Sequence, residues 1–221
     1  MAMPPATRST TSREGPLPAH ARHTSFAHRL LVTVACLLAT QATHAAPWAA
    51  RVRNAAGQPV ADAVIAVEPE GRGAKAAQAT AQMVQRQRQF QPYVLVIQTG
   101  TAVSFPNFDT VRHHVYSFSA TKTFDIKLYT GTPAQPVVFD KAGVATLGCN
   151  IHDRMSAHVV VVDTPLFGKS DAEGWVRLDV PPGHHRLLFW HPKLETTALR
   201  SRPLTVDADG RPLELTLDIA D

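Results

Sequence analysis

The sequence predicts an all-β protein, on three observations. From about residue 51, short runs of β-branched and aromatic residues recur at regular spacing, with turn-forming residues between them. Residues 159–162 are apolar at every position, as expected of a strand that is covered on both faces. Residues 213–219 alternate between Leu or Ile and polar residues, which predicts a final strand with one buried face.

Composition sets the size and excludes some classes of protein. The chain has 221 residues, of which 44% are hydrophobic and 18% charged, so it is a folded chain of one or two small domains. The formal net charge is +4, but residues 1–45 hold four Arg against one Glu. The remainder is nearly neutral and lacks the basic face that a nucleic-acid-binding protein needs.

The first 45 residues have the layout of a Sec-type signal peptide. The apolar run 30–39 follows Arg22 and Arg29, and a small residue, Ala45, stands at the expected cleavage point. Ten apolar residues are too few to span a bilayer. The sequence therefore predicts a periplasmic protein with no membrane span after the signal peptide is removed.

Export makes the cysteines informative. The chain contains Cys36 and Cys149, and Cys36 leaves with the signal peptide. A single thiol in an oxidising compartment must be buried, paired between chains or bound to a metal.

Strands are expected at the apolar runs of the chain, and one segment departs from this pattern. The expected strands are 94–97, 102–105, 115–118, 124–129, 137–139, 144–147 and 159–162, with others at both chain ends. Residues 74–89 are rich in Ala and Gln, and a short helix is expected there.

The two chain ends carry matching motifs. Residues 54–64 (NAAGQPVADAV), 171–178 (DAEGWVRL) and 181–189 (PPGHHRLLF) together resemble carboxypeptidase regulatory-like, or transthyretin-like, domains. The resemblance implies a small sandwich built from residues 46–72 and 164–221, with residues 73–163 inserted as a second domain. The alternative is a single larger sandwich with decorated ends.

The chemistry is concentrated in residues 148–155. Cys149, His152 and Met155 occur at i, i+3 and i+6 in a loop between two expected strands, where a tight turn can direct them to one point. Thiolate, imidazole and thioether donors suit copper, and two His with one Cys and a weak Met form a blue-copper set. The second imidazole comes from His113 or His114, and strand parity does not choose between them. Taken singly, each of these residues is more often structural.

Two segments resemble the cupredoxins, the plastocyanin and amicyanin group of blue-copper proteins. They are residues 103–118 (VSFPNFDTVRHHVYSF) and 143–155 (GVATLGCNIHDRM). The resemblance implies a Greek-key cupredoxin sandwich beside the smaller sandwich of the chain ends. It also implies one blue-copper ion, held by His113, Cys149, His152 and Met155.

The chain departs from the family at three positions. His114 stands where an Asn usually follows the first histidine ligand, Gly148 replaces an aromatic residue, and Ile151 replaces a Pro. These changes affect the surroundings of the metal and so its reduction potential.

The expected function is a one-electron carrier, not an enzyme. Its partners would be a transient redox donor and acceptor reached through the edge of His152, and the carrier itself is expected to be a monomer. Amicyanin-like resemblance implies an amine-oxidising dehydrogenase as donor, as in methylamine utilisation. The alternatives are a periplasmic copper-delivery protein and a β-sandwich binding module without metal. No paired catalytic carboxylates and no nucleophile motif occur in the sequence.

Overall fold

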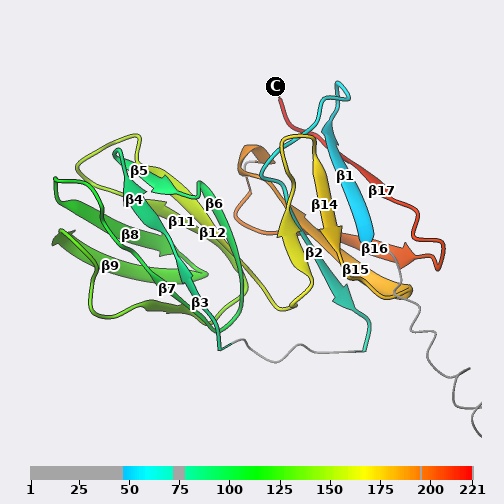
Figure 1. Cartoon of the computed structure of the whole chain (residues 1–221), viewed down its shortest axis with the longest axis horizontal. Coiled ribbons are helices and arrows are strands. Elements are labelled where there is room, and N and C mark those ends of the chain that lie inside the picture. Colours follow the sequence, from blue (N-terminus) through cyan, green and yellow to red (C-terminus); the bar gives the residue numbers. More distant parts are fainter. Residues whose placement is uncertain (1–46, 72–77, 195, 221) are drawn as a thin grey trace, which may run out of the picture. The chain divides into compact units, whose positions relative to one another are not determined.

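The computed structural model describes residues 47–71, 78–194 and 196–220, all within one compact unit of the chain (Figure 1). The predicted signal peptide, with Cys36, lies outside the described residues. In the part that is described, no helix has the length and apolar character needed to cross a membrane.

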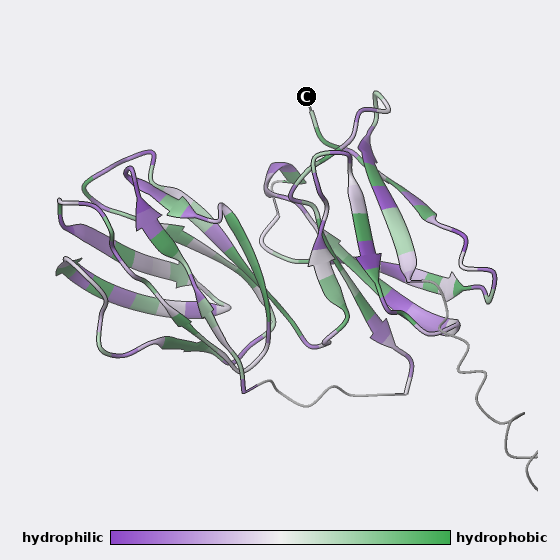
Figure 2. Cartoon of the chain, viewed as in Figure 1, coloured by the Kyte–Doolittle hydropathy of each residue, from purple (hydrophilic) through white to green (hydrophobic). Residues whose placement is uncertain are grey.

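The all-β prediction is confirmed. The strands are β1 (Trp48–Asn54), β2 (Val64–Pro69), β3 (Thr80–Gln82), β4 (Val84–Arg86), β5 (Gln89–Gln91), β6 (Val94–Gln98), β7 (Thr101–Ser104), β8 (His113–Ser119), β9 (Lys122–Tyr129), β10 (Val137–Phe139), β11 (Gly143–Gly148), β12 (Ser156–Val162), β13 (Phe167–Lys169), β14 (Trp175–Leu178), β15 (Gly183–Trp190), β16 (Arg200–Val206) and β17 (Leu213–Leu217). One short 3₁₀ helix, Pro192–Leu194, interrupts them. Apolar and polar residues alternate along many of the strands, as the striped ribbons of Figure 2 show.

Three sheets surround the core beside the metal-ligand candidates. The largest has five strands in the order β6-β12-β11-β8-β9, and it is joined by the sheet β10-β7-β3 and the β4–β5 hairpin. The buried residues of these elements form one cluster, which contains Phe105, Phe139, Leu147, Cys149 and Met155. Both sulfur ligand candidates are therefore part of the hydrophobic core.

Strand β12 is covered on both faces, as predicted. Val159 and Val161 belong to the cluster beside the ligand candidates, whereas Val160 and Val162 pack in a second cluster with residues of β2 and β15. All four side chains are essentially inaccessible to solvent. A continuous apolar run was needed because neither face of the strand contacts water.

The chain ends form two further sheets, β14-β1-β17 and β13-β2-β15-β16, which share a hydrophobic cluster of their own. Strand β17 alternates as predicted, with Leu215 and Leu217 buried. Gly174 has a φ of 83°, and a Cβ there would lie 2.4 Å from the backbone oxygen of Val52. Only glycine fits this turn. The assignment of residues 46–72 and 164–221 to a transthyretin-like domain, interrupted by 73–163, stays a prediction.

The expected helix at 74–89 is wrong where the structure describes it. Residues 80–82, 84–86 and 89–91 are strands, and β3 pairs in parallel with β7. Met83 and Gln85 are fully buried, and the Gln85 amide donates hydrogen bonds to the backbone oxygen of Phe105 and to the Tyr129 hydroxyl. These tertiary contacts outweigh the favourable helix propensity of Ala and Gln.

The core assignment predicts that Phe105 and Phe118 contribute very differently to the free energy of unfolding. Phe105 is 1% exposed and packs against Phe124, whereas Phe118 is 76% exposed. Phe105→Ala should lower the free energy of unfolding by about 3–5 kcal/mol. Phe118→Ala should change it by less than about 0.5 kcal/mol. Urea denaturation of both variants measures the difference, and equal losses would contradict this core assignment.

Candidate metal centre

Backbone hydrogen bonds set the shape of the ligand loop. The ladder between β11 and β12 ends at the pair Gly148 and Ser156, and the amide of Cys149 then donates to the carbonyl oxygen of Met155 at 3.2 Å. The amide of Met155 donates to the carbonyl oxygen of His152 at 2.8 Å. These bonds close a tight turn, so the side chains of Cys149 and His152 face each other.

The third donor comes from the start of β8. His113 pairs with Tyr129 of β9, and the register then shifts before Val115 pairs with Ile126. The β8–β9 ladder is therefore irregular at the first residues of β8, where His113 lies. The His113 side chain is completely buried.

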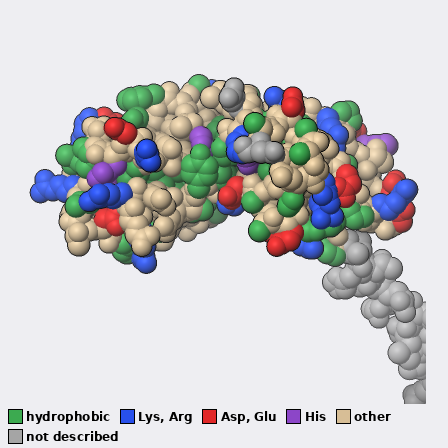
Figure 3. Space-filling model, turned by 90° about the horizontal axis from the view of Figure 1, so that it is seen from above, with side chains coloured by type: hydrophobic (Ala, Val, Ile, Leu, Met, Phe, Trp, Pro, Cys, Tyr) green, Lys and Arg blue, Asp and Glu red, His purple; other side chains and the backbone are tan. Residues whose placement is uncertain are grey.

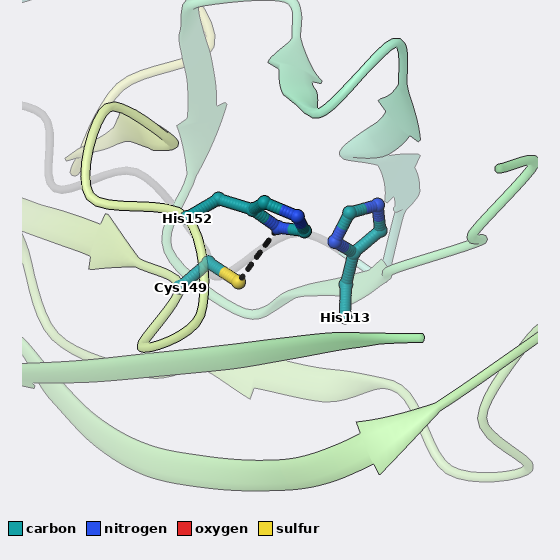
Figure 4. A group of neighbouring side chains, drawn as sticks. All are labelled: His113, Cys149 and His152. Atoms are coloured by element: carbon teal, nitrogen blue, oxygen red, sulfur yellow. Dashed lines mark hydrogen bonds between the residues drawn. The ribbon is translucent and has the colours of Figure 1, made fainter. Parts of the chain in front are cut away.

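Three candidate ligand atoms converge, one each from His113, Cys149 and His152 (Figure 4). They lie within 4.8 Å of one another, and Cys149 Sγ is 3.9 Å from His152 Nδ1. Metal bonds of about 2.3 Å to sulfur and 2.0 Å to nitrogen, about 120° apart, would separate the two donor atoms by about 3.7 Å. The separation of Cys149 Sγ and His152 Nδ1 therefore fits two ligands of a single metal ion.

The two ring nitrogens of His113 differ in their partners. Nε2 lies 2.8 Å from Asp109 Oδ2, whereas Nδ1 is buried and has no hydrogen-bond partner. In Figure 4, Nδ1 is the ring nitrogen of His113 that faces His152. An ionised carboxylate can only accept, so Nε2 carries the proton and Nδ1 presents a lone pair. A buried lone pair without a partner is costly, and a metal ion at this point would satisfy it.

Asp109 is itself held firmly. Its carboxylate accepts the amide of Gln87 at 2.7 Å and the amide of Arg88 at 2.9 Å. Burial acts to raise the pKa of Asp109, but the Arg88 amide, the His113 ring and the Gln87 amide bring that pKa below 3.8 overall. The carboxylate is thus ionised at neutral pH and keeps His113 in the tautomer that can bind a metal.

A two-residue turn supplies both of these amides. Gln87 and Arg88 have φ values of 54° and 57°, the left-handed values of a type I′ turn between β4 and β5. Side chains other than Gly and Asn adopt these values at a cost. Asp109 offsets that cost by accepting both amides of the turn.

The structure distinguishes His113 from His114, which sequence parity left open. His114 directs its Nε2 to the carboxylate of Asp125, and its ring lies 5.4 Å from that of Tyr116. It is absent from the convergent group. His113 is the histidine that lies beside Cys149 and His152.

Met155 is 2% exposed and packs in the same core cluster as Cys149. Both of its backbone polar groups belong to the loop hydrogen bonds described above. Cys149 and Met155 also line one open groove of about 420 Å³ together with Tyr116 and Gly148. The axial role of Met155 stays a prediction.

Two tyrosines, Tyr116 and Tyr129, lie near the ligand loop. A Cβ on residue 148 would lie 2.7 Å from Tyr116 Cζ, so the Tyr116 ring occupies the space beside Gly148. Tyr129 donates its hydroxyl to Phe105 O at 2.6 Å. Burial raises the pKa of Tyr129 to about 12, and the proximity of Cys149 adds to the rise. Tyr129 is therefore neutral beside the sulfur.

The other histidines are not part of this group. His185 and His191 are buried, and His158 packs between Tyr93 and Trp190. Burial lowers the pKa of His158, and the proximity of His191 lowers it further. Within the described residues, the group of His113, Cys149 and His152 is the one metal-binding cluster that emerges.

Sequence reasoning missed Asp109 and the turn that holds it. Asp109 lies four residues before His113, in the segment that carried the cupredoxin resemblance, and this spacing was the available signal. The contribution of Gln87 and Arg88 has no sequence signal, because only their backbone amides take part.

No protein-family model and no curated protein matches the chain. Part of it is similar in structure to amicyanin. A reduced variant of amicyanin matches 44% of this chain and 98% of its own length, with 17% identity and a TM-score of 0.35. A purple cupredoxin from Nitrosopumilus maritimus matches 38% of this chain and all of its own length, with 23% identity and a TM-score of 0.33.

A larger protein is also similar over one segment. The copper-containing nitrite reductase from Thermus scotoductus SA-01 matches 44% of this chain but only 26% of its own length, with 27% identity and a TM-score of 0.35.

Asp109→Asn should weaken copper binding about 10–100-fold, because the His113 ring loses the carboxylate that fixes its tautomer. Competition titration against a Cu(I) chelator measures the affinity. Asp140→Asn is the matched control, since Asp140 pairs with Lys122 on an exposed surface. An unchanged affinity in Asp109→Asn would show that this hydrogen bond does not support the metal site.

Proposed function

We propose that this protein is an exported copper protein that carries single electrons between redox partners. The observation that carries the proposal is the buried His113 Nδ1, which has no partner and belongs to a group with Cys149 Sγ and His152. Soft sulfur and imidazole donors in this arrangement favour copper over zinc, which prefers four strong ligands. When bound, copper would supply the Cu(II)/Cu(I) couple.

The protein's own contribution is to hold the donors still. Cys149 and Met155 are fixed by the ladder and by the bonds that close the loop, and His113 is fixed by Asp109. A rigid donor set keeps the same geometry in both oxidation states, so little reorganisation opposes electron transfer. Met155 would supply a fourth, weak thioether ligand.

Side chains around His152 suit a brief encounter with a partner. His152 is partly exposed, and three large apolar residues beside the site are exposed, namely Phe108 (59%), Val111 (38%) and Ile151 (46%). A small apolar patch favours weak, short-lived complexes. We place this encounter in the periplasm, after removal of residues 1–45, and we infer an amine-oxidising dehydrogenase as donor.

The hydrogen bonds of the loop favour a carrier over a copper-delivery protein. Release of the metal needs a loop that opens, whereas residues 149–155 are closed by two backbone hydrogen bonds. Slow loss of copper to an excess of chelator would support the carrier. Rapid loss would support delivery instead.

Voltammetry of the copper-loaded protein tests the proposal through Met155. Met155→Leu should raise the reduction potential while copper stays bound, because removing a weak thioether donor destabilises Cu(II) more than Cu(I). Met83→Leu is the control, since Met83 is buried in the same core cluster but lies outside the ligand loop. A potential that moves equally in both variants would contradict axial ligation, and a protein without a reversible couple would contradict the carrier.

A further inference from the structure

The arginines of residues 73–163 lie in the loops and the hairpin beside the metal-ligand candidates. Residues 73–163 contain eight Lys and Arg against five Asp and no Glu. All four arginines of this segment, Arg86, Arg88, Arg112 and Arg154, belong to the loops and the hairpin beside the metal-ligand candidates and are exposed. We call these four residues the arginine face. Figure 3 shows Lys and Arg side chains at the end of the molecule where β8 and β9 lie in Figure 1.

Each member is tied to the site by a contact or by its neighbours. The Arg88 amide binds Asp109, and the Arg86 guanidinium lies 5.2 Å from the ring centroid of Phe108. Arg112 directly precedes His113, and Arg154 belongs to the ligand loop. All four arginines therefore belong to segments that carry the candidate ligands or contact the loop before His113.

These charges are free to meet a partner. Within the described residues, no carboxylate lies within ion-pair distance of any of the four guanidinium groups. By contrast, Lys122 and Lys127 of the same segment pair with Asp140 and Asp125. Uncompensated positive charge is thus concentrated beside the site, although the whole chain after residue 45 is nearly neutral.

We propose that the arginine face docks an acidic protein surface, that of the redox partner of the copper site. The inference rests on the proposed function. Exposed apolar side chains, namely Phe108, Val111 and Ile151, lie in the same loops as the arginines. Aromatic residues and Arg are enriched in protein interfaces, whereas a nucleic-acid surface needs a broader basic face. Opposite charge steers the encounter, and the apolar patch provides the contact.

Cytochrome c provides a probe with adjustable charge. Its native form is rich in lysine, and succinylation converts those lysines to carboxylates without changing the haem. The ferric haem of the probe accepts one electron, which copper held by His113, Cys149 and His152 would supply, and no bond is made or broken. Docking itself is followed by NMR titration of the full chain, with and without copper.

The expected result is a localised and salt-sensitive response. Amide shifts on adding succinylated cytochrome c should cluster at the arginine face and vanish at high ionic strength. Arg86→Gln/Arg112→Gln should slow electron transfer about tenfold at low ionic strength, with an unchanged reduction potential. Lys122→Gln/Lys141→Gln removes the same charge from the first residue of β9 and from the loop before β11, at the strand ends opposite the site, and should have little effect.

The outcomes separate docking from copper chemistry. Equal losses in both double variants, shifts elsewhere on the molecule, or preference for native cytochrome c would overturn the proposal. Tighter binding of duplex DNA than of the succinylated protein would overturn the assignment to a protein partner. If the chain forms no redox-active copper site yet shifts cluster at the arginine face, the proposed function fails and the docking surface stands.

Discussion

A buried hydrogen bond between His113 and Asp109 is the interaction on which the site depends. Because the carboxylate accepts the proton of Nε2, the Nδ1 lone pair is left without a partner in a region closed to water. Among the residues that the structure describes, no group around His113 Nδ1 forms a hydrogen bond with it, so its burial is costly. The same bond orients the ring toward Cys149 and His152, so one contact explains both the tautomer and the convergence of three donors.

The contact is supported by parts of the chain that are distant in sequence. The β4–β5 turn donates two amides to Asp109, and Asn107 organises the same loop by donating to the backbone oxygens of Val111 and Tyr129. The other side of the site is held by the end of the β11–β12 ladder. The β4–β5 turn and the buried side-chain amide of Asn107 thus both help to hold the donor atoms rigidly on the β-sandwich.

Much of the fold followed from local pattern. Alternation and apolar runs identified the strands of the five-stranded sheet, because side-chain burial in a strand repeats every two residues. The failure at 80–91 has a physical reason: the segment was assigned from helix propensity, whereas burial of Met83 and Gln85 decides its conformation. Cys149 and His152 could be found because their spacing lies within one loop. Asp109 had only its spacing of four residues before His113 as a signal, and the turn that holds it had none, since any residue provides backbone amides.

Titration of the full chain with Cu(II), followed by visible absorption, tests the central claim most directly. A thiolate bound to Cu(II) should produce an intense charge-transfer band that saturates at one equivalent and is absent in Cys149→Ser. A colourless mixture, or a band that persists in Cys149→Ser, would contradict a copper site formed by His113, Cys149 and His152.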